Sequence, residues 1–468
     1  MMRTSLSLTA NQQAELKAHL FPGDGKEAVA IALCGRRVGT DHHRLLVHQI
    51  VPIPYEYCSQ RAPDFVTWST EILIPLLGTA SKYSMGIVKI HSHPEDFPQH
   101  SETDDEADRR LFPSIYGWMD SDYPHASAIM LPSGRIIGRT VSSSGQFEPL
   151  SVVKVVGDEL DFWYTDNSVE DVPEFALRTA QTFGEDTFAK LKRLKIGVAG
   201  CSGTGSLVIE QLARYGVGAL VLVDPDQIEE KNLNRILGAT IQDAQYRTLK
   251  VDVARRNIDR MGLGTEVVTF PTSLFNAEVV RAIADCDVVF GCMDSIDGRW
   301  LLNRLATYYL LPYFDVGVKL VADGKGGIEQ ICGGVRYLQP GRSSLVSRGM
   351  FTLEQVRGAG MKRTDPLHYE QQKQLNYIVG LPEDNRPAVI SVNMYYASLS
   401  VLELLARLHP YRDDPNSEYA SYMVSLSQAR ICLEREQEPC LILRKKAGRG
   451  DVTPLLDNPE LSEIEVGV

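Results

Sequence analysis

The stretch that decides the fold runs from Leu194 to Asp224 and reads LKIGVAGCSGTGSLVIEQLARYGVGALVLVD. Residues 194–200 form a short apolar run that ends in glycine, and residues 219–224 form a second apolar run. Between the two runs, apolar residues at 207, 208, 212 and 215 have the spacing of one buried helix face. A strand, a glycine-rich turn, a helix and a second strand predict the start of a parallel, doubly wound α/β sheet.

The alternation of strands and helices continues toward the C-terminus. We expect a helix over 248–261, a strand over 287–294 and a returning helix near 389–407, after a polar excursion at 341–386. Toward the N-terminus, the polar, acidic segment 164–175 is typical of a linker, and the residues before it mix short β-rich runs with helical stretches. The predicted parts are a first α/β or α+β domain over 1–163, the linker over 164–175, an α/β domain over 176–409, and a tail of unknown role over 410–468.

Composition excludes several classes of protein. Hydrophobic residues make up 44% of the 468 residues and charged residues 23%, which is typical of globular domains and not of a disordered chain. The chain shows no apolar run long enough for a membrane span and no signal-peptide core at its start. Its formal charge of −12 gives no overall basic footprint for nucleic acid. The eight cysteines are scattered, without a CxxC pair, as in reduced thiols. We therefore predict a cytoplasmic protein with neither a nucleic acid nor a membrane as partner.

A pair of histidines is the sharpest signal in the N-terminal part. His91 and His93 are two residues apart on an extended segment, so their side chains point to the same side and can bind one metal ion. Asp104, on the helix that follows, can add a third ligand, and three ligands with an open position are typical of catalytic zinc. Ser101 and Asp104 also fit a plain capping box, so the pattern alone leaves metal binding and helix capping both open.

The full spacing, HSHP, six residues, Ser, two residues, Asp, resembles the motif of the JAMM (MPN/JAB) zinc metallopeptidases. The resemblance covers about residues 20–140. It implies that His91, His93 and Asp104 bind zinc and that Ser101 supports the oxyanion. It also implies that Glu27, which precedes the first apolar strand, is the general base.

The glycine-rich turn carries the second candidate site. Gly200, Gly203 and Gly205 lie between a predicted strand and helix, where backbone N–H groups can cradle phosphate, and Asp224 can hold a ribose hydroxyl. NAD-dependent oxidoreductases also have a glycine-rich turn between a strand and a helix. Their glycine pattern requires glycine at position 202, where this chain has serine. Residues suited to a triphosphate and Mg²⁺ follow, and a nicotinamide site does not need them. They are Asn232, Arg235, Lys250, Asp294, Arg299 and Asn303.

This ordered set resembles the ThiF/MoeB family of ubiquitin-activating-like adenylyltransferases over about residues 176–407. The resemblance implies that Asp224 binds the ATP ribose, and that Asp294 binds Mg²⁺. It also implies that the phosphates are contacted by Asn232, Arg235 and Lys250. Arg178 matches an arginine that reaches the ATP of the opposite protomer in relatives, which implies a homodimer. The implied reaction is attack of a C-terminal carboxylate, typically Gly-Gly, on the ATP α-phosphate, which gives an acyl-adenylate and pyrophosphate.

Two departures from that family stand out. Ser344 and Ser347 occupy positions where many relatives carry cysteines of a structural zinc site, so we expect that zinc to be absent. No cysteine lies between Cys332 and Cys432, so the usual thioester-forming nucleophile is missing unless Cys432 or Cys440 serves.

The two resemblances together predict a JAMM-type α/β domain followed by a Rossmann-like, doubly wound ThiF/MoeB-type domain. The leading hypothesis is a bifunctional enzyme, a zinc (iso)peptidase that cuts after a ubiquitin-like C-terminus and a Mg-ATP-dependent adenylyltransferase that activates that terminus. Its partner is a small ubiquitin-like or sulfur-carrier protein with a Gly-Gly-type C-terminus, with a conjugating enzyme in the first case. The alternatives are sulfur-carrier activation for thiocarboxylate-based cysteine, siderophore or cofactor synthesis, and a ubiquitin-like-binding scaffold with one inactive half.

Overall fold

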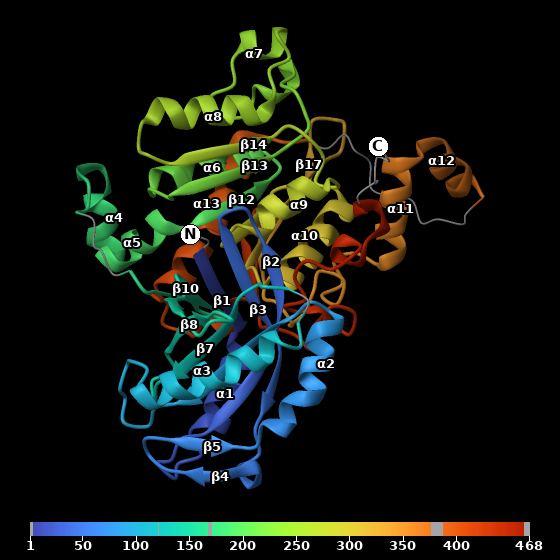
Figure 1. Ribbon diagram of the computed structural model, residues 1–468. Helices are drawn as coiled ribbons and strands as arrows, with labels where there is room; N and C mark the ends of the chain where they lie inside the picture. Colours follow the sequence, from blue (N-terminus) through green and yellow to red (C-terminus); the bar gives the residue numbers. More distant parts are fainter. Residues whose placement is uncertain (1–2, 120, 167–170, 376–386, 463–468) are drawn as a thin grey trace. The chain divides into compact units, whose positions relative to one another are not determined.

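The computed structural model describes residues 3–119, 121–166, 171–375 and 387–462, which form two compact units (Figure 1). The first unit comprises Met1–Ser168 with two short pieces, Tyr308–Leu310 and Lys446–Thr453. The second comprises Val169–Thr307, Leu311–Lys445 and Pro454–Val468. In the described ranges, no helix is both long enough and apolar enough to cross a bilayer.

The first unit is built on a nine-stranded mixed sheet in the order β11-β10-β1-β3-β2-β6-β7-β8-β9. These strands are β1 (Arg3–Thr9), β2 (Val29–Val38), β3 (His42–Pro52), β6 (Gly86–Ser92), β7 (His125–Met130), β8 (Ile136–Val141), β9 (Phe147–Pro149), β10 (Val152–Val156) and β11 (Leu160–Tyr164). A separate hairpin joins β4 (Cys58–Arg61) to β5 (Val66–Trp68). The helices are α1 (Ala10–Leu20), α2 (Ile74–Lys82) and α3 (Glu102–Tyr116).

Strand alternation gives this sheet a hydrophobic core on each face. Ala30 and Ala32 of β2 join the cluster that contains Leu16 of α1. Ile31 of the same strand joins the other cluster, which contains Phe112 of α3. Because successive strand side chains point to opposite faces, one strand covered on both sides reads as a continuous apolar run. The sheet therefore fixes α3 on the face opposite α1.

The piece Lys446–Thr453 packs on β2 of the same unit. The Gly35 amide donates to the Gly448 carbonyl at 3.1 Å, and the Asp451 amide donates to the Arg36 carbonyl at 2.7 Å. A Cβ on Gly448 would lie 2.3 Å from the Val47 carbonyl oxygen, so only glycine permits this approach. Part of the predicted tail is thus bound to the strand that follows Glu27.

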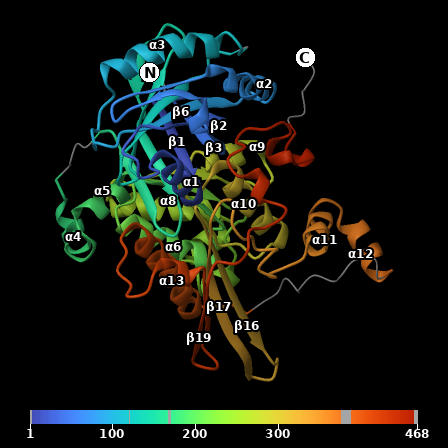
Figure 2. The same cartoon turned by 90° about the horizontal axis from the view of Figure 1, so that it is seen from below.

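The second unit contains an eight-stranded sheet in the order β14-β13-β12-β15-β16-β17-β18-β19. The strands are β12 (Lys195–Ala199), β13 (Ala219–Val223), β14 (Glu266–Phe270), β15 (Val288–Gly291), β16 (Tyr313–Ala322), β17 (Ile328–Leu338), β18 (Ser421–Ser425) and β19 (Arg430–Glu434). Pairing is parallel from β14 to β16 and antiparallel from β16 to β19. The predicted parallel, doubly wound part is thus found from β14 to β16, and two hairpins that were not predicted extend the sheet with antiparallel strands (Figure 2).

The helices of this unit are α4 (Leu177–Phe183), α5 (Glu185–Arg193), α6 (Gly203–Arg214), α7 (Ile241–Gln245), α8 (Lys250–Met261), α9 (Ala277–Ala284), α10 (Ile296–Tyr309), α11 (Leu353–Thr364), α12 (Pro366–Gln374) and α13 (Ile390–Leu408). The helix expected near 389–407 is α13, which packs against α6. The strand order reverses at β12, with β13 on one side and β15 on the other. The carboxyl ends of these three strands form the edge where open α/β sheets bind ligands.

Candidate functional sites

The predicted metal-binding side chains of the first unit converge. His91 is the last but one residue of β6, His93 follows the strand, and α3 brings Asp104 from the next element. The Nε2 atoms of His91 and His93 lie 3.1 Å apart. Asp104 places Oδ1 2.9 Å from His91 Nε2 and Oδ2 3.4 Å from His93 Nε2. Glu27 Oε1 lies 3.9 Å from His93 Nε2. Glu27, His91 and His93 each have an atom able to bind a metal, and these three atoms lie within 4.8 Å of one another.

The capping box predicted at Ser101 is confirmed and orients Asp104. The backbone amide and the hydroxyl of Ser101 both donate to Asp104 Oδ2, at 2.7 and 2.8 Å, and the Asp104 amide donates to Ser101 Oγ at 3.1 Å. The capping role and a ligand role are therefore compatible, because Asp104 Oδ1 faces His91.

The protonation pattern of this cluster fits a divalent cation. His93 Nδ1 is 2.8 Å from the Phe97 carbonyl oxygen, which can only accept, so Nδ1 carries a proton and Nε2, which faces Asp104, is the ring nitrogen that could bind a metal ion in place of that contact. Burial raises the pKa of Glu27 to about 8, with Asp104 adding to the effect. Despite burial, the hydrogen bonds from His91 and His93 hold the pKa of Asp104 well below its usual range. Asp104 lies within 3.4 Å of both Nε2 atoms and Glu27 within 3.9 Å of one, so the cluster offers the nitrogen and oxygen donors that zinc takes.

A buried ion-pair network fixes α3 one turn beyond Asp104. Lys89 of β6 lies 2.5 Å from Asp108 Oδ1, and Arg139 of β8 lies 2.8 Å from Asp108 Oδ2. Arg139 also pairs with Asp105 at 2.5 Å. Asp108 is fully buried, so both cations are needed to offset its desolvation. This network is not evident from the sequence, because Lys89 has the pattern of an ordinary polar residue in an apolar strand.

In the second unit, the predicted glycines are closely approached, Gly200 and Gly205 by backbone atoms and Gly203 by side chains. Gly200 has a φ of +92°, and a Cβ there would lie 2.7 Å from the Cys292 carbonyl oxygen. A Cβ on Gly205 would lie 1.8 Å from the Gly200 carbonyl oxygen. A Cβ on Gly203 would lie 2.2 Å from Asn393 Nδ2 and 3.0 Å from Arg235 Cδ. The loop therefore brings Arg235 and the segment after β15 to the N-terminus of α6.

Asp224 and Lys250 meet beside this loop. Asp224 accepts hydrogen bonds from the amides of Cys201 at 2.7 Å and Asp226 at 2.9 Å. Lys250 Nζ lies 3.6 Å from Asp224 Oδ1 and 2.6 Å from Asp226 Oδ2. Burial raises the pKa of Asp224, while Lys250 opposes the shift. One buried carboxylate and one buried ammonium are thus held at the ends of β12 and β13.

The remaining predicted residues differ in their placement. Asn232 is buried and caps a 3₁₀ turn, where its Oδ1 accepts from the Glu229 amide at 3.0 Å. Asp294 is exposed and follows β15, three residues after Gly291. Arg178 is exposed on α4 and donates to Gln181 Oε1 of the same helix at 2.9 Å, and its reach to the ATP of an opposite protomer stays a prediction.

Two further residues of the predicted set have structural partners. Arg299 forms a two-point ion pair with the fully buried Asp315, at 2.8 and 2.6 Å. Asn303 Oδ1 accepts from the Leu345 amide at 2.9 Å, which anchors the segment that contains Ser344 and Ser347. Those two serines hydrogen-bond to each other, with the Ser344 amide 2.8 Å from Ser347 Oγ.

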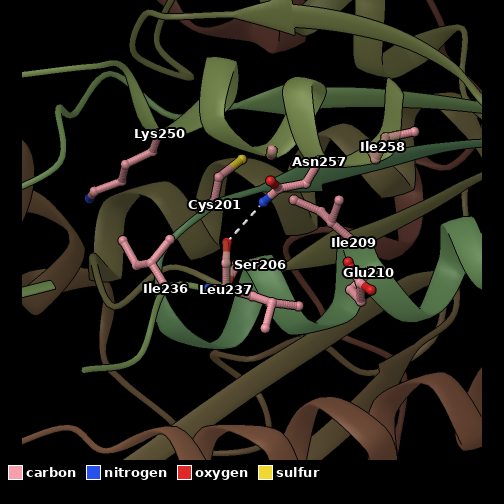
Figure 3. A pocket seen from close by; sticks show the side chains of 10 residues that line it. Cys201, Ser206, Ile209, Glu210, Ile236, Leu237, Lys250, Asn257 and Ile258 are labelled. Atoms are coloured by element: carbon pink, nitrogen blue, oxygen red, sulfur yellow. Dashed lines mark hydrogen bonds between the residues drawn. The ribbon is translucent and has the colours of Figure 1, made fainter. Parts of the chain in front are cut away.

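A small pocket beside the loop is lined in part by residues that belong to no motif of the sequence. Ser206, Leu237 and Asn257 line it together with Cys201 and Lys250 (Figure 3). Asn257 donates from Nδ2 to the Leu237 carbonyl at 3.0 Å, and the Leu237 amide donates to Ser206 Oγ at 3.2 Å. These bonds tie α6, α8 and the segment after Arg235 together. Asn393, which approaches Gly203, is a polar residue within the mostly apolar helix α13. The sequence shows that it is polar but does not show what it contacts.

The two cysteines of the tail lie in different environments. Cys432 is exposed on β19, whereas Cys440 is buried, with 2% of its surface accessible. An exposed thiol is the more accessible of the two to a reagent in solution.

Comparison with known proteins places the second unit in a family. The family model described as "ThiF family" matches residues 176–440, more than half of the chain. "Adenylyltransferase and sulfurtransferase UBA4" of Meyerozyma guilliermondii is 32% identical over 142 residues, which cover 30% of this chain and 31% of that protein. "Ubiquitin-like modifier-activating enzyme 5" of Arabidopsis thaliana is 25% identical over 190 residues, which cover 38% of this chain and 42% of that protein. The chain thus spans less than half the length of these curated relatives.

Solved structures give a similar but more distant match. A structure described as E. coli MccB with ATP is 16% identical, with a TM-score of 0.44, and the match covers 58% of this chain and 74% of MccB. A structure of PaaA is 18% identical, with a TM-score of 0.42 and coverage of 58% and 78%. On the family match, the chain belongs to the ThiF family.

Proposed function

We propose that the second unit adenylates the C-terminal carboxylate of a small ubiquitin-like or sulfur-carrier protein, using ATP and Mg²⁺. The observation that carries the proposal is the joint placement of the glycine loop, Asp224 and Lys250 at the switch point of a ThiF-family sheet. The curated relatives described above are named for adenylyl transfer and for activation of ubiquitin-like modifiers.

In this reaction the residues of the second unit bind ATP and Mg²⁺ and orient the α-phosphate for attack. The N–H groups at the start of α6 receive phosphate oxygens, and Asp224 accepts hydrogen bonds from the ribose. Lys250 is paired with Asp226, whose carboxylate side chain is 65% exposed, so a bound phosphate can replace that partner. Asp294 holds Mg²⁺, while Asn232 and Arg235 position the triphosphate. A carboxylate oxygen of the partner attacks the α-phosphorus, the bond to the β-phosphate breaks, and pyrophosphate leaves with the electron pair.

The experiment is ATP–pyrophosphate exchange in the presence of a ubiquitin-like protein that ends in Gly-Gly. We expect exchange by the unmodified chain and its loss in Asp294→Ala. The matched control is His91→Ala, which alters the first unit and should leave exchange unchanged. Exchange that survives Asp294→Ala would remove Asp294 from the proposed Mg²⁺ site.

We propose a second activity for the first unit, that of a zinc (iso)peptidase of JAMM type. The specific observation is the convergence of His91, His93 and Asp104, with Glu27 beside them. A zinc ion held by these residues would supply a Lewis acid that makes water nucleophilic near neutral pH. Glu27 would take the proton from that water and pass it to the leaving amine, and the Ser101 hydroxyl would turn its proton from Asp104 Oδ2 to the oxyanion.

Metal content tests this second proposal independently of ATP chemistry. We expect about one zinc per chain by elemental analysis, and its loss in His91→Ala and in Asp104→Ala. His48→Ala is a matched control, because His48 bonds to the Ala447 carbonyl and not to this cluster. A full zinc load in both ligand variants would refute the site.

The fate of the adenylate defines an alternative. Because Cys332 and Cys432 have no cysteine between them, the adenylate can pass directly to an external nucleophile. Sulfide would give a thiocarboxylate, as expected for a sulfur carrier, whereas an amine or a conjugating enzyme would give a conjugate. Mass spectrometry of the partner's C-terminus after reaction with sulfide separates these outcomes. A scaffold with one inactive half is excluded if both the zinc load and the exchange activity are found.

A further inference from the structure

We propose that Arg61 is a positioning residue of the first unit, which holds the backbone of Glu27 so that the Glu27 carboxylate stays directed at His93. This role rests on the proposed (iso)peptidase activity, in which Glu27 is the general base. Three features support it: the place of Glu27 before the strand pairing of β2 begins, the hydrogen bonds that Arg61 makes there, and an aromatic stack that holds the guanidinium.

Glu27 lies just before the paired part of β2. The strand pairs with β6 from Val29 onward and with β3 from Ala30 onward. Ala28, the residue between, is bonded to the last residue of β6. The carboxylate of Glu27 reaches within 3.9 Å of His93 Nε2. Because the sheet itself does not hold the peptide groups of Glu27, the direction of this carboxylate depends on other contacts.

The end of the hairpin strand β4 supplies those contacts. The Glu27 amide donates to the Ala62 carbonyl at 2.8 Å, and Arg61 Nε donates to the Glu27 carbonyl at 2.8 Å. Arg61 Nη1 donates to Asp24 Oδ2 at 2.9 Å, and Nη2 lies 3.4 Å from both Asp24 Oδ1 and the Lys26 carbonyl oxygen. The N–H groups of a guanidinium form a rigid planar fork. One side chain therefore fixes Glu27 and the segment before it together.

A stack of two rings holds Arg61 in turn. The guanidinium carbon lies 4.0 Å from the centroid of the Tyr55 ring, and the rings of Tyr55 and His19 stack at 5.0 Å. The Tyr55 hydroxyl donates to the His19 carbonyl at 2.6 Å, and His19 Nε2 lies 3.0 Å from the Val29 carbonyl oxygen. The Arg61 side chain is only 11% exposed, so water weakens this cation–π contact little. The stack thus reaches the start of β2 at two carbonyls, those of Glu27 and Val29.

Arg61 acts on the base through the backbone and not through the carboxylate. The hydrogen bond that joins the two residues ends at the Glu27 carbonyl. The proposed zinc ligands are His91, His93 and Asp104, which lie on or next to β6 and α3. Without Arg61, we expect the peptide of Glu27 to rotate and its carboxylate to turn away, while the zinc ligands stay in place. A displacement of a catalytic group by about 1 Å can lower the rate by about 10²-fold.

A double-mutant cycle tests whether Arg61 acts through Glu27. In the zinc-loaded, full-length chain we expect Arg61→Met to lower kcat for a Gly-Gly-linked substrate by about 10–100-fold, with KM and zinc content unchanged. In the Glu27→Gln background the same change should cost nothing further, because no base is left to position. Gln60→Met is the matched control, since Gln60 is the exposed neighbour on the same strand. Equal losses in both backgrounds, or loss of zinc in Arg61→Met, would overturn the proposal.

Hydrogen exchange measures the hold on Glu27 without a catalytic readout. In the same full-length chain we expect Arg61→Met to speed exchange of the Glu27 amide by about tenfold, and Gln60→Met to leave it unchanged. Unchanged exchange in Arg61→Met overturns the proposal even if cleavage falls. An unmodified chain that binds zinc but cleaves nothing refutes the (iso)peptidase instead, and with it the catalytic purpose of this contact. The exchange rates then still decide whether Arg61 holds Glu27.

Discussion

Single residues of the glycine-rich loop are fixed by how closely other backbone passes them. Gly205 is the tightest case, since its Cβ position lies 1.8 Å from the Gly200 carbonyl oxygen. We expect Gly205→Ala to shift the loop, lower the unfolding temperature and abolish ATP–pyrophosphate exchange. Overpacking a tight site costs about 1–3 kcal/mol of unfolding free energy. Thermal unfolding and exchange measurements check the two effects.

The control for this change is Gly360→Ala. Gly360 lies inside α11, and no heavy atom outside that helix's own backbone lies within 4 Å of the position that a Cβ would take. Alanine there should leave exchange unchanged and stabilise the helix by up to ~1 kcal/mol, because alanine has the higher helix propensity. Equal effects of the two substitutions would contradict the role given to close packing at Gly205.

Glu27 and Asp104 have different predicted roles, although both face the same histidines. If Glu27 moves a proton and Asp104 binds metal, Glu27→Gln keeps the zinc and lowers (iso)peptidase activity by about 10²–10⁴-fold. Asp104→Ala loses both zinc and activity. Elemental analysis and cleavage of a Gly-Gly-linked substrate distinguish the two variants. Loss of zinc in Glu27→Gln would instead make Glu27 a ligand, which its position in the cluster with His91 and His93 allows.

The residues of both sites differ in how far the sequence could predict them. His91, His93 and Asp104 could be predicted because local spacing on one strand and the following helix fixes their positions. Asn393 could not, because its approach to Gly203 depends on how α13 returns to the sheet, far along the chain. Motifs report local geometry, whereas contacts between distant segments appear only once the chain is folded.

At the scale of elements, α3 is the support on which the first site depends. Its N-terminus carries Asp104, and one turn later Asp108 is held by Lys89 and Arg139. Removal of Arg139 leaves the buried Asp108 with Lys89 alone and one carboxylate oxygen without its ion-pair partner, which costs up to about 3–5 kcal/mol. We expect Arg139→Met to lower the unfolding temperature of the first unit and to weaken zinc affinity, although Arg139 binds no metal. Calorimetry and zinc titration measure these effects.

Arg110→Met on the same helix is the matched control. Arg110 pairs with Glu106 at 3.6 Å on an exposed face, where such pairs contribute about 0.3–0.5 kcal/mol. It should therefore leave stability and zinc affinity almost unchanged. Unaltered zinc affinity in Arg139→Met would show that α3 holds Asp104 without this network.

The antiparallel half of the second sheet shows where element prediction fails. The strands from β12 to β15 alternate with helices, so their parallel order follows from local pattern. In contrast, Gly334 of β17 pairs with Met423 of β18, 89 positions later in the chain. No periodicity within either strand specifies that pairing, because strand register is set by non-local contacts. The antiparallel extension of the predicted parallel sheet was missed for this reason.

At the scale of the whole molecule, the two proposed sites raise the question of whether they act in order. A peptidase that exposes a Gly-Gly terminus prepares the substrate of an adenylating enzyme, whereas one that cuts conjugates opposes it. If the sites act in succession, the unmodified chain supports ATP–pyrophosphate exchange with a partner that carries residues beyond Gly-Gly. His91→Ala should not support exchange with that extended partner, because the carboxylate stays within a peptide bond.

A partner that already ends in Gly-Gly is the control for this experiment. With it, His91→Ala and the unmodified chain should give equal exchange, because no cleavage is needed before the attack on ATP. Asp294→Ala should show the reverse behaviour, since it cleaves the extended partner but supports no exchange with either form. Equal exchange by His91→Ala with both partners would contradict succession. That result would leave the peptidase the opposite task of removing the partner from finished conjugates, because the metal site would then contribute nothing to activation.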